Sequence, residues 1–161
     1  METEPLPLSG AEAAKPPAGP YTNSFCVQLS STGRGARLAR LFAVQHLAEW
    51  DVPYGSALSD SSALVTAELA ANAVRHCGGT GRDFRLRVRM AAAAYVRIEV
   101  VDTCADRPLP AGPLTPSHDL RFGHGLLLVD AVATRWGSTR NDSVTKTVWA
   151  ELGPGPPTED T

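Results

Sequence analysis

Apolar residues recur at helical spacing in three segments of the chain. Residues 36–50 carry large apolar side chains three or four positions apart, after a Ser31-Thr32-Gly33 sequence that suits a helix cap. Asp51-Val52-Pro53 ends this helix, because the residue before a proline disfavours helical backbone. Residues 58–77 predict a second helix that Gly78-Gly79 stops, and residues 125–134 predict a third.

Strict alternation of apolar and polar residues predicts a strand over 84–90, with Arg85, Arg87 and Arg89 on its wet face. Residues 24–30 alternate in the same way, and residues 94–102 are the expected antiparallel neighbour of 84–90. Residues 135–138 and 144–151 predict a closing hairpin. Together these elements predict an α+β fold, a two-layer α/β sandwich with a mostly antiparallel sheet and helices on one face.

The two ends of the chain differ from its middle. Residues 1–22 and 153–161 are rich in proline and poor in large apolar groups, so we expect disordered tails around one domain over 23–152. Residues 108–121 contain four prolines and predict a long loop. A length of 161 residues suits a single domain of this kind.

Composition narrows the classes of partner and the compartment. A formal charge of -2 and a pI near 6.1 give no electrostatic reason to expect direct nucleic-acid or membrane binding. Cys26, Cys77 and Cys104 are too scattered for a CxxC pair or a zinc set. An odd cysteine count without a signal peptide favours reduced thiols and a cytoplasmic location.

Glu68 and Asn72 lie four positions apart on the otherwise apolar second helix, and His76 continues their row. A glutamate there could act as a general base, and an asparagine could hold a hydrated Mg²⁺ through its amide oxygen. The alternative is a helix with one solvated edge. For His76 we favour a place at the helix end, where the dipole stabilises a cation.

Two further sites have binding chemistry. Asp102 ends an apolar strand just before a loop, where binding groups are common, although aspartate is also a frequent turn residue. Gly123-His124-Gly125-Leu126 opens the third helix, whose free N–H groups could hold an anion. The alternative for the glycine pair is a tight turn, and for His124 a solvent-facing place in the loop.

These motifs occur in a specific order: Glu68 and Asn72, then Asp102, then the glycine pair, then Thr147 in the last hairpin. In that order the chain resembles the GHKL superfamily of ATP-binding domains, which have the Bergerat-type fold. Within this superfamily it is most similar to the bacterial anti-sigma factor serine kinases, especially the actinobacterial ones. The resemblance covers residues 24–152.

The resemblance implies ATP and Mg²⁺ as ligands and gives each motif a role. Glu68 matches the catalytic glutamate, Asn72 the magnesium-binding asparagine and Asp102 the residue that recognises adenine. Residues 109–122 would form a mobile lid over the nucleotide. The remaining nucleotide-binding positions are Gly123, His124, Gly125, Leu126 and Thr147.

One motif departs from the family pattern. Cys104 and Asp106 stand where glycines are usual after the aspartate, although the spacing from Asp102 to Pro108 fits a D-x-S-x-x-x-P variant. Three functions therefore stay open: a serine kinase acting on an anti-sigma factor antagonist, a non-catalytic regulator of an antagonist or sigma factor with ATP as ligand, and a domain without nucleotide. Self-association through the first helix and its neighbouring strand is a further expectation.

Overall fold

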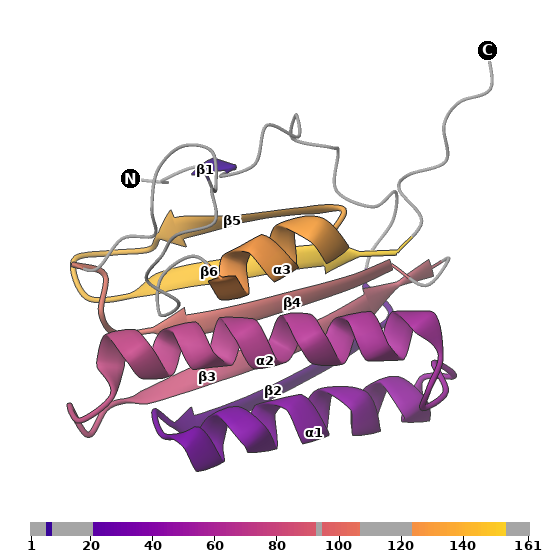
Figure 1. The fold of residues 1–161 in the computed structure, drawn as a ribbon, viewed down its shortest axis with the longest axis horizontal. Helices are drawn as coiled ribbons and strands as arrows, with labels where there is room; N and C mark the ends of the chain where they lie inside the picture. The colour runs from indigo at the N-terminus through magenta and orange to yellow at the C-terminus, as the bar shows by residue number, and fades with distance from the viewer. Residues whose placement is uncertain (1–5, 8–20, 93–94, 107–123, 154–161) are drawn as a thin grey trace.

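The protein is a two-layer sandwich in which three helices cover one face of an antiparallel sheet (Figure 1). The computed structural model describes residues 6–7, 21–92, 95–106 and 124–153. The helices are α1 (Gly33–Glu49), α2 (Ala57–Cys77) and α3 (His124–Val132). This architecture confirms the predicted fold class.

The sheet has six strands in the order β1-β5-β6-β4-β3-β2, and every neighbouring pair is antiparallel. β4 and β6 therefore lie side by side in the middle of the sheet, although about forty residues separate them in the chain. The strands are β1 (Leu6–Pro7), β2 (Asn23–Ser30), β3 (Asp83–Ala91), β4 (Tyr95–Asp102), β5 (Arg135–Arg140) and β6 (Lys146–Leu152).

The N-terminus of α1 shows why the chain folds back onto the sheet at this point. The side chain of Thr32 caps the helix by accepting a hydrogen bond from the Gly35 N–H at 3.1 Å. A Cβ on Gly35 would lie 1.8 Å from the carbonyl oxygen of Ser30. Only glycine lets the first turn of α1 approach the end of β2 this closely.

The two faces of the sheet have different chemistry. Side chains that alternate along β4 and β6 toward the helices form the core, among them Val100 and Val148. The outer face instead carries charged residues: Glu99 accepts from the Arg97 Nε at 2.9 Å, and Glu151 accepts from the Arg97 Nη1 at 2.6 Å. The helix-covered face is thus the side on which a buried cleft can form.

The predicted elements are present, with boundaries shifted by a few residues. One difference is β1, because Leu6–Pro7 pairs with β5 inside the segment predicted as an N-terminal tail. The rest of that tail, the C-terminal tail from residue 154 and the predicted lid over 109–122 lie outside the described residues. Within the described ranges, no helix is long and apolar enough to cross a membrane.

Candidate functional site

Helix α2 brings its polar row to the border between the helices and the sheet. Asn72 is 4% exposed, and its Nδ2 has no hydrogen-bond partner among the described residues. Glu68, one turn earlier on the same face, is half-buried. A buried amide without a partner is costly, so Asn72 is a polar group that a ligand could satisfy.

Asp102 lies at the end of β4, on the same side of the sheet as the core residues Val100 and Val148. It is 1% exposed; its Oδ1 accepts a hydrogen bond from the Cys104 N–H at 2.9 Å, and its Oδ2 has no hydrogen-bond partner within the described ranges. Burial raises the pKa of the Asp102 carboxyl, although the Cys104 N–H and the Lys146 ammonium act in the opposite direction. Asp102 thus retains one buried acceptor for a ligand.

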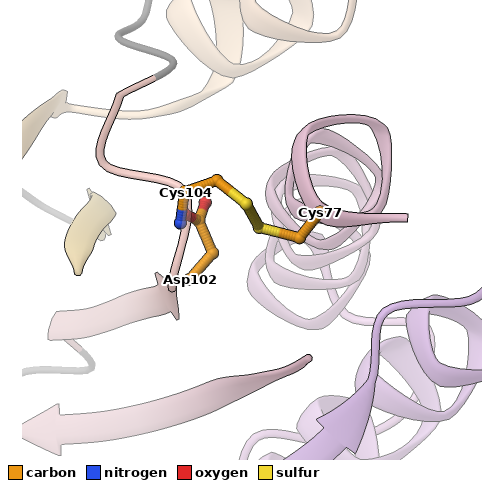
Figure 2. A group of neighbouring side chains, drawn as sticks. All are labelled: Cys77, Asp102 and Cys104. Atoms are coloured by element: carbon orange, nitrogen blue, oxygen red, sulfur yellow. A yellow bond between two sulfur atoms is a disulfide. The ribbon is translucent and has the colours of Figure 1, made fainter. Parts of the chain in front are cut away.

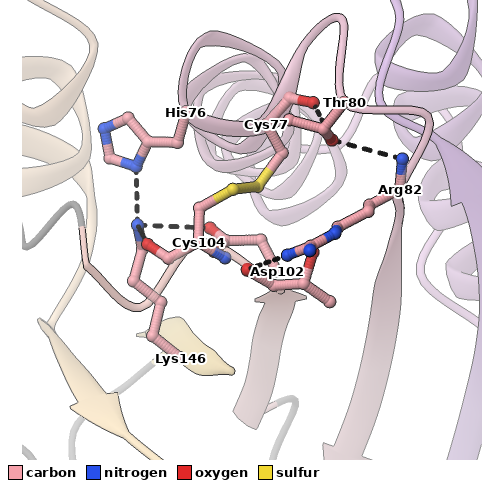
Figure 3. The surroundings of a disulfide bond; sticks show 8 residues. His76, Cys77, Thr80, Arg82, Asp102, Cys104 and Lys146 are labelled. Carbon is pink, nitrogen blue, oxygen red and sulfur yellow. Dashed lines mark hydrogen bonds and ion pairs between the residues drawn. A yellow bond between two sulfur atoms is a disulfide. The ribbon is translucent and has the colours of Figure 1, made fainter. Parts of the chain in front are cut away.

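Lys146 is a site residue that the sequence did not reveal. It pairs with Asp102 across β4 and β6, is 3% exposed, and places its Nζ 3.5 Å from the Asp102 Oδ2. At this distance the two charges form an ion pair, but the separation is too long for a normal hydrogen bond. The same ammonium donates to the Cys104 carbonyl oxygen at 3.0 Å and lies 2.6 Å from the Nδ1 of His76 (Figure 3).

His76 thereby joins the row of α2 to the strand ends. It lies in the last turn of α2, as expected, but its ring contacts Lys146 rather than only the helix end. Eight residues of helix separate it from Glu68, which corresponds to about 12 Å along the axis. The row therefore runs from the Asp102–Lys146 pair toward the middle of α2.

Thr147 is not brought together with Asp102. In the register of β4 and β6 it lies opposite Val101, so its side chain points to the outer face of the sheet. There its hydroxyl oxygen accepts from the Nδ2 of Asn141 at 2.9 Å. The residue next to Asp102 on the helix-covered face is Lys146.

Helix α3 begins at His124 and lies beside α2 and over β5 and β6 (Figure 1). Its first turn has backbone N–H groups without intrahelical partners, which suits an anion. Leu126 is 3% exposed and belongs to the core, so only its backbone could contact a phosphate. Gly123 and the side chain of His124 lie outside the described part of the chain.

The two cysteines near the site form a disulfide. Cys77 at the end of α2 is bonded to Cys104 in the loop after β4, with a Cα–Cα distance of 6.0 Å (Figure 2). The expectation of reduced thiols is wrong for this pair, because the fold brings together two residues that are 27 positions apart. Cys26, exposed on β2, is a free thiol.

The ligand atoms of Cys77, Asp102 and Cys104 also lie within 4.8 Å of one another, a spacing that a metal ion could bridge. In this structure the two sulfur atoms are bonded to each other, and thiolates are the form that binds metals. The neighbouring Lys146 ammonium further opposes a cation at this point. The amide oxygen of Asn72 is of the kind that Mg²⁺ prefers, whereas the orphaned Nδ2 of the same amide is a donor and suits an acceptor such as a phosphate oxygen.

A hollow of about 260 Å³ opens next to the polar pair on the helix-covered side. Lys146 and the loop residues Ala105 and Asp106 form one wall, and β5 forms the other. The ammonium of Lys146 thus borders open space, while Asn72 on α2 is not among the residues that line the hollow. The hollow is lined by Ala105, Asp106, Ser138, Thr139, Arg140 and Lys146.

Comparison with known proteins supports the fold. No protein-family model matches the chain, and no curated protein matches it. Among solved structures, it is similar to a crystal structure of the RsbU and RsbW domains of Rv1364c from Mycobacterium tuberculosis, with a TM-score of 0.57 and 18% identity. The two proteins share a fold.

This likeness covers 84% of the present chain but only 34% of the Mycobacterium tuberculosis chain. The present chain therefore spans about a third of the protein that it matches. The likeness confirms, at the level of the fold, the architecture that the resemblance implies. At this identity it carries no residue's role across.

Proposed function

We propose that the protein is an ATP- and Mg²⁺-binding regulator of the anti-sigma factor serine kinase class. The observation that carries the proposal is a pair of buried polar side chains, Asn72 and Asp102, each with one atom that lacks a hydrogen-bond partner in the described part of the chain. Native proteins rarely leave such atoms unsatisfied, and clusters of them mark binding sites. Both lie on the helix-covered side of the sheet.

The order of the groups matches what a nucleotide requires. Asp102 would accept a hydrogen bond from the amino group of adenine, and the first turn of α3 would hold phosphate oxygens through its backbone N–H groups. Asn72 would hold Mg²⁺, which offsets negative charge on the phosphates when bound. Thr147, on the outer face, is not part of this arrangement.

For phosphoryl transfer, Glu68 would act as the general base. Its half-buried position one turn from Asn72 places a carboxylate where it can accept the proton of an incoming serine hydroxyl. The acceptor protein would be an anti-sigma factor antagonist, and the regulated protein a sigma factor. Both are partners that a domain of this class would bind through protein contacts.

The test measures ATP affinity with and without Mg²⁺ by calorimetry, on wild type and Asn72→Ala. We expect magnesium to strengthen ATP binding in wild type and to have little effect in the variant. A ligand at about 100 times its Kd adds about 2.7 kcal/mol of stability, so thermal unfolding provides a second readout. No binding of ATP to wild type in either redox state of its cysteines would sink the proposal.

A second candidate is a regulator that binds its partner without phosphoryl transfer. Cys104 and Asp106, in place of the usual glycines, motivate it, because Cys104 is fixed to α2 and restricts the loop that follows Asp102. The Glu68→Gln variant distinguishes the kinase from the non-catalytic regulator, since it removes the general base and keeps the shape of the side chain. If the Glu68→Gln variant still binds the partner but no longer phosphorylates the antagonist, the protein is a kinase. If wild type does not phosphorylate the antagonist, the protein is the non-catalytic regulator.

Self-association through α1 and β2 belongs to the same proposal. β2 is an eight-residue strand at the edge of the sheet, and α1 packs beside it. Sedimentation at increasing protein concentration tests this expectation. A monomer at the highest concentration would reject it.

A further inference from the structure

The disulfide joins the two sides of the proposed nucleotide site. Cys77 ends the helix that carries Glu68 and Asn72, and Cys104 follows the strand that ends in Asp102. Cys104 is also the residue whose backbone meets the polar pair, since its N–H donates to Asp102 and its carbonyl accepts from Lys146. Figure 3 shows Asp102 and Lys146 beside the S–S bond between Cys77 and Cys104.

We propose that the Cys77–Cys104 disulfide is a reversible redox site. Its reduction by a dithiol opens the end of the nucleotide site that binds adenine. The inference rests on the proposed function and adds its regulation. In the oxidised form the loop after β4 is fixed to α2, and the site binds nucleotide weakly. In the reduced form the loop is released and the site binds nucleotide tightly.

Three features of Asp102 and its surroundings show why the oxidised form would exclude an adenine base. Asp102 is 1% exposed, and one of its two carboxylate oxygens is already occupied by the Cys104 N–H. The other oxygen faces the Lys146 ammonium at 3.5 Å. The disulfide fixes the loop at residues 103–106, which follows this carboxylate, to the end of α2.

Release of Cys104 changes both contacts together. Its N–H occupies one oxygen of Asp102 and its carbonyl accepts from Lys146, so a shift of this one residue frees an acceptor oxygen while Lys146 keeps its contact with His76. The freed oxygen is then available to a donor on the edge of an adenine base. The hollow next to Lys146 is lined by Ala105 and Asp106 of the same loop and would widen with it.

The chemistry is ordinary thiol–disulfide exchange. One thiolate of the dithiol attacks the Sγ of Cys104, which is 6% exposed, whereas Cys77 is fully buried. The S–S bond breaks, Cys77 leaves as a thiolate and takes up a proton, and a mixed disulfide forms at Cys104. The second thiol of the dithiol then displaces Cys104, which also takes up a proton, and the dithiol leaves as its cyclic disulfide.

The experiment compares the two redox states of one protein. All measurements use the full chain carrying Cys26→Ser, which removes the exposed free thiol and with it any cross-link between molecules. One sample is kept oxidised, and the other is reduced with dithiothreitol. Alkylation and mass spectrometry establish the state of Cys77 and Cys104, and calorimetry measures the Kd for ATP with Mg²⁺.

We expect the reduced sample to bind ATP about tenfold more tightly, a coupling of usual size between two sites. The double variant Cys77→Ser/Cys104→Ser should bind like the reduced sample, and dithiothreitol should not change its affinity. Should that variant fail to fold, Cys77→Ala/Cys104→Ala replaces it. Equal affinity in the two redox states, or alkylation of both cysteines in the oxidised sample, would overturn the inference.

Hydrogen exchange separates this inference from the proposed function. Reduction should speed exchange of the Cys104 N–H, which is bonded to Asp102, by more than it speeds exchange of the N–H groups of β3, which follow the overall loss of stability. ATP that binds equally to both forms leaves the proposed function standing and removes the redox control. If neither form binds ATP, the proposed function falls. Unchanged exchange at the Cys104 N–H would then also overturn the coupling between the disulfide and the loop after β4. Faster exchange at this N–H would support that coupling.

Discussion

Strands β4 and β6 carry two clusters of buried charges, one on each face of the sheet. On the outer face, Glu151 is fully buried and accepts from the Tyr95 hydroxyl, from Arg97 and from Arg135. On the helix-covered face, Asp102 has one backbone N–H and a more distant ammonium, Lys146. The two carboxylates lie on neighbouring strands but differ in how completely they are satisfied.

The difference distinguishes a cluster that holds the fold from one that could bind. Both oxygens of Glu151 have partners, and the ring of Trp149 lies under the guanidinium groups of Arg97 and Arg135 at 4.5 and 5.3 Å. Such a network satisfies both carboxylate oxygens and fixes neighbouring strands, although the Nε of Arg89 and the Nε1 of Trp149 on this face lack hydrogen-bond partners among the described residues. Asp102 and Asn72 instead each keep one atom without a hydrogen-bond partner among the described residues, and the Asp102 atom has only the more distant Lys146 ammonium beside it.

The largest expected effect is at the outer cluster. Glu151→Ala leaves the half-buried Arg97 and Arg135 without their carboxylate, so we expect a loss of about 3 kcal/mol in the free energy of unfolding, measured with urea. Glu49→Ala, at an exposed position of α1, is the matched control and should change stability by less than about 0.5 kcal/mol. A similar small loss in both variants would show that the outer cluster does not hold the strands together.

At the inner cluster, Lys146→Met removes the ammonium and leaves the Asp102 carboxylate with only the Cys104 N–H. We expect a loss of about 1–3 kcal/mol by urea unfolding. Adding Asp102→Asn to this variant should restore part of the loss, because the unpaired charge is then gone. Strictly additive losses in this double-mutant cycle would mean that the two side chains are not coupled.

Glu99 provides a pH-dependent test of the outer cluster. Burial acts to raise the pKa of Glu99, but hydrogen bonding and charge from Arg97 and Arg89 outweigh it, and the folded pKa lies below its usual value of 4.5. The stabilisation is therefore present above that value and is lost as the pH falls through the folded pKa. We expect Glu99→Gln to lose about 1 kcal/mol at pH 7 and to match wild type in strong acid. A loss that stays constant from pH 7 to pH 2 contradicts this assignment.

The smallest stability effect is expected at Asn72. Its Nδ2 has no partner, and alanine favours helix, so Asn72→Ala should change the free energy of unfolding by less than about 1 kcal/mol. The affinity for ATP with Mg²⁺ should nevertheless fall about tenfold or more, as is usual when a metal site loses a supporting group. Asn141→Ala, at an exposed position bonded to Thr147, is the control and should leave affinity unchanged. Equal losses of affinity in the two variants would place the nucleotide elsewhere.

The architecture could be read from the sequence because its signals are local. Alternation in 84–90 and the capping residue Thr32 each report the structure of their own segment. β1 could not be predicted, since a two-residue strand has no periodicity and exists only because β5 offers it an edge. The candidate residues Glu68, Asn72 and Asp102 also follow from local signals, the first two from helical spacing and the third from its place at a strand end, and their roles stay predictions.

The features of the candidate site that the sequence did not reveal depend on contacts between residues far apart in the chain. Thr147 and Lys146 are adjacent in the sequence, and a one-residue difference in register decides which of them faces Asp102. No pattern in the sequence fixes that register before the sheet is known. The same is true of Cys77 and Cys104, whose pairing requires the end of α2 to meet the loop after β4.

The Cys77–Cys104 bond also closes a covalent ring around the whole β3–β4 hairpin, since the two cysteines are 27 positions apart. A ring of this size restricts the unfolded chain and raises stability by about 3.5 kcal/mol on the chain-entropy account. Reduction would therefore do more than release one loop. The form that binds nucleotide would also be the form that unfolds and is degraded more readily, so each activated molecule would have a limited lifetime.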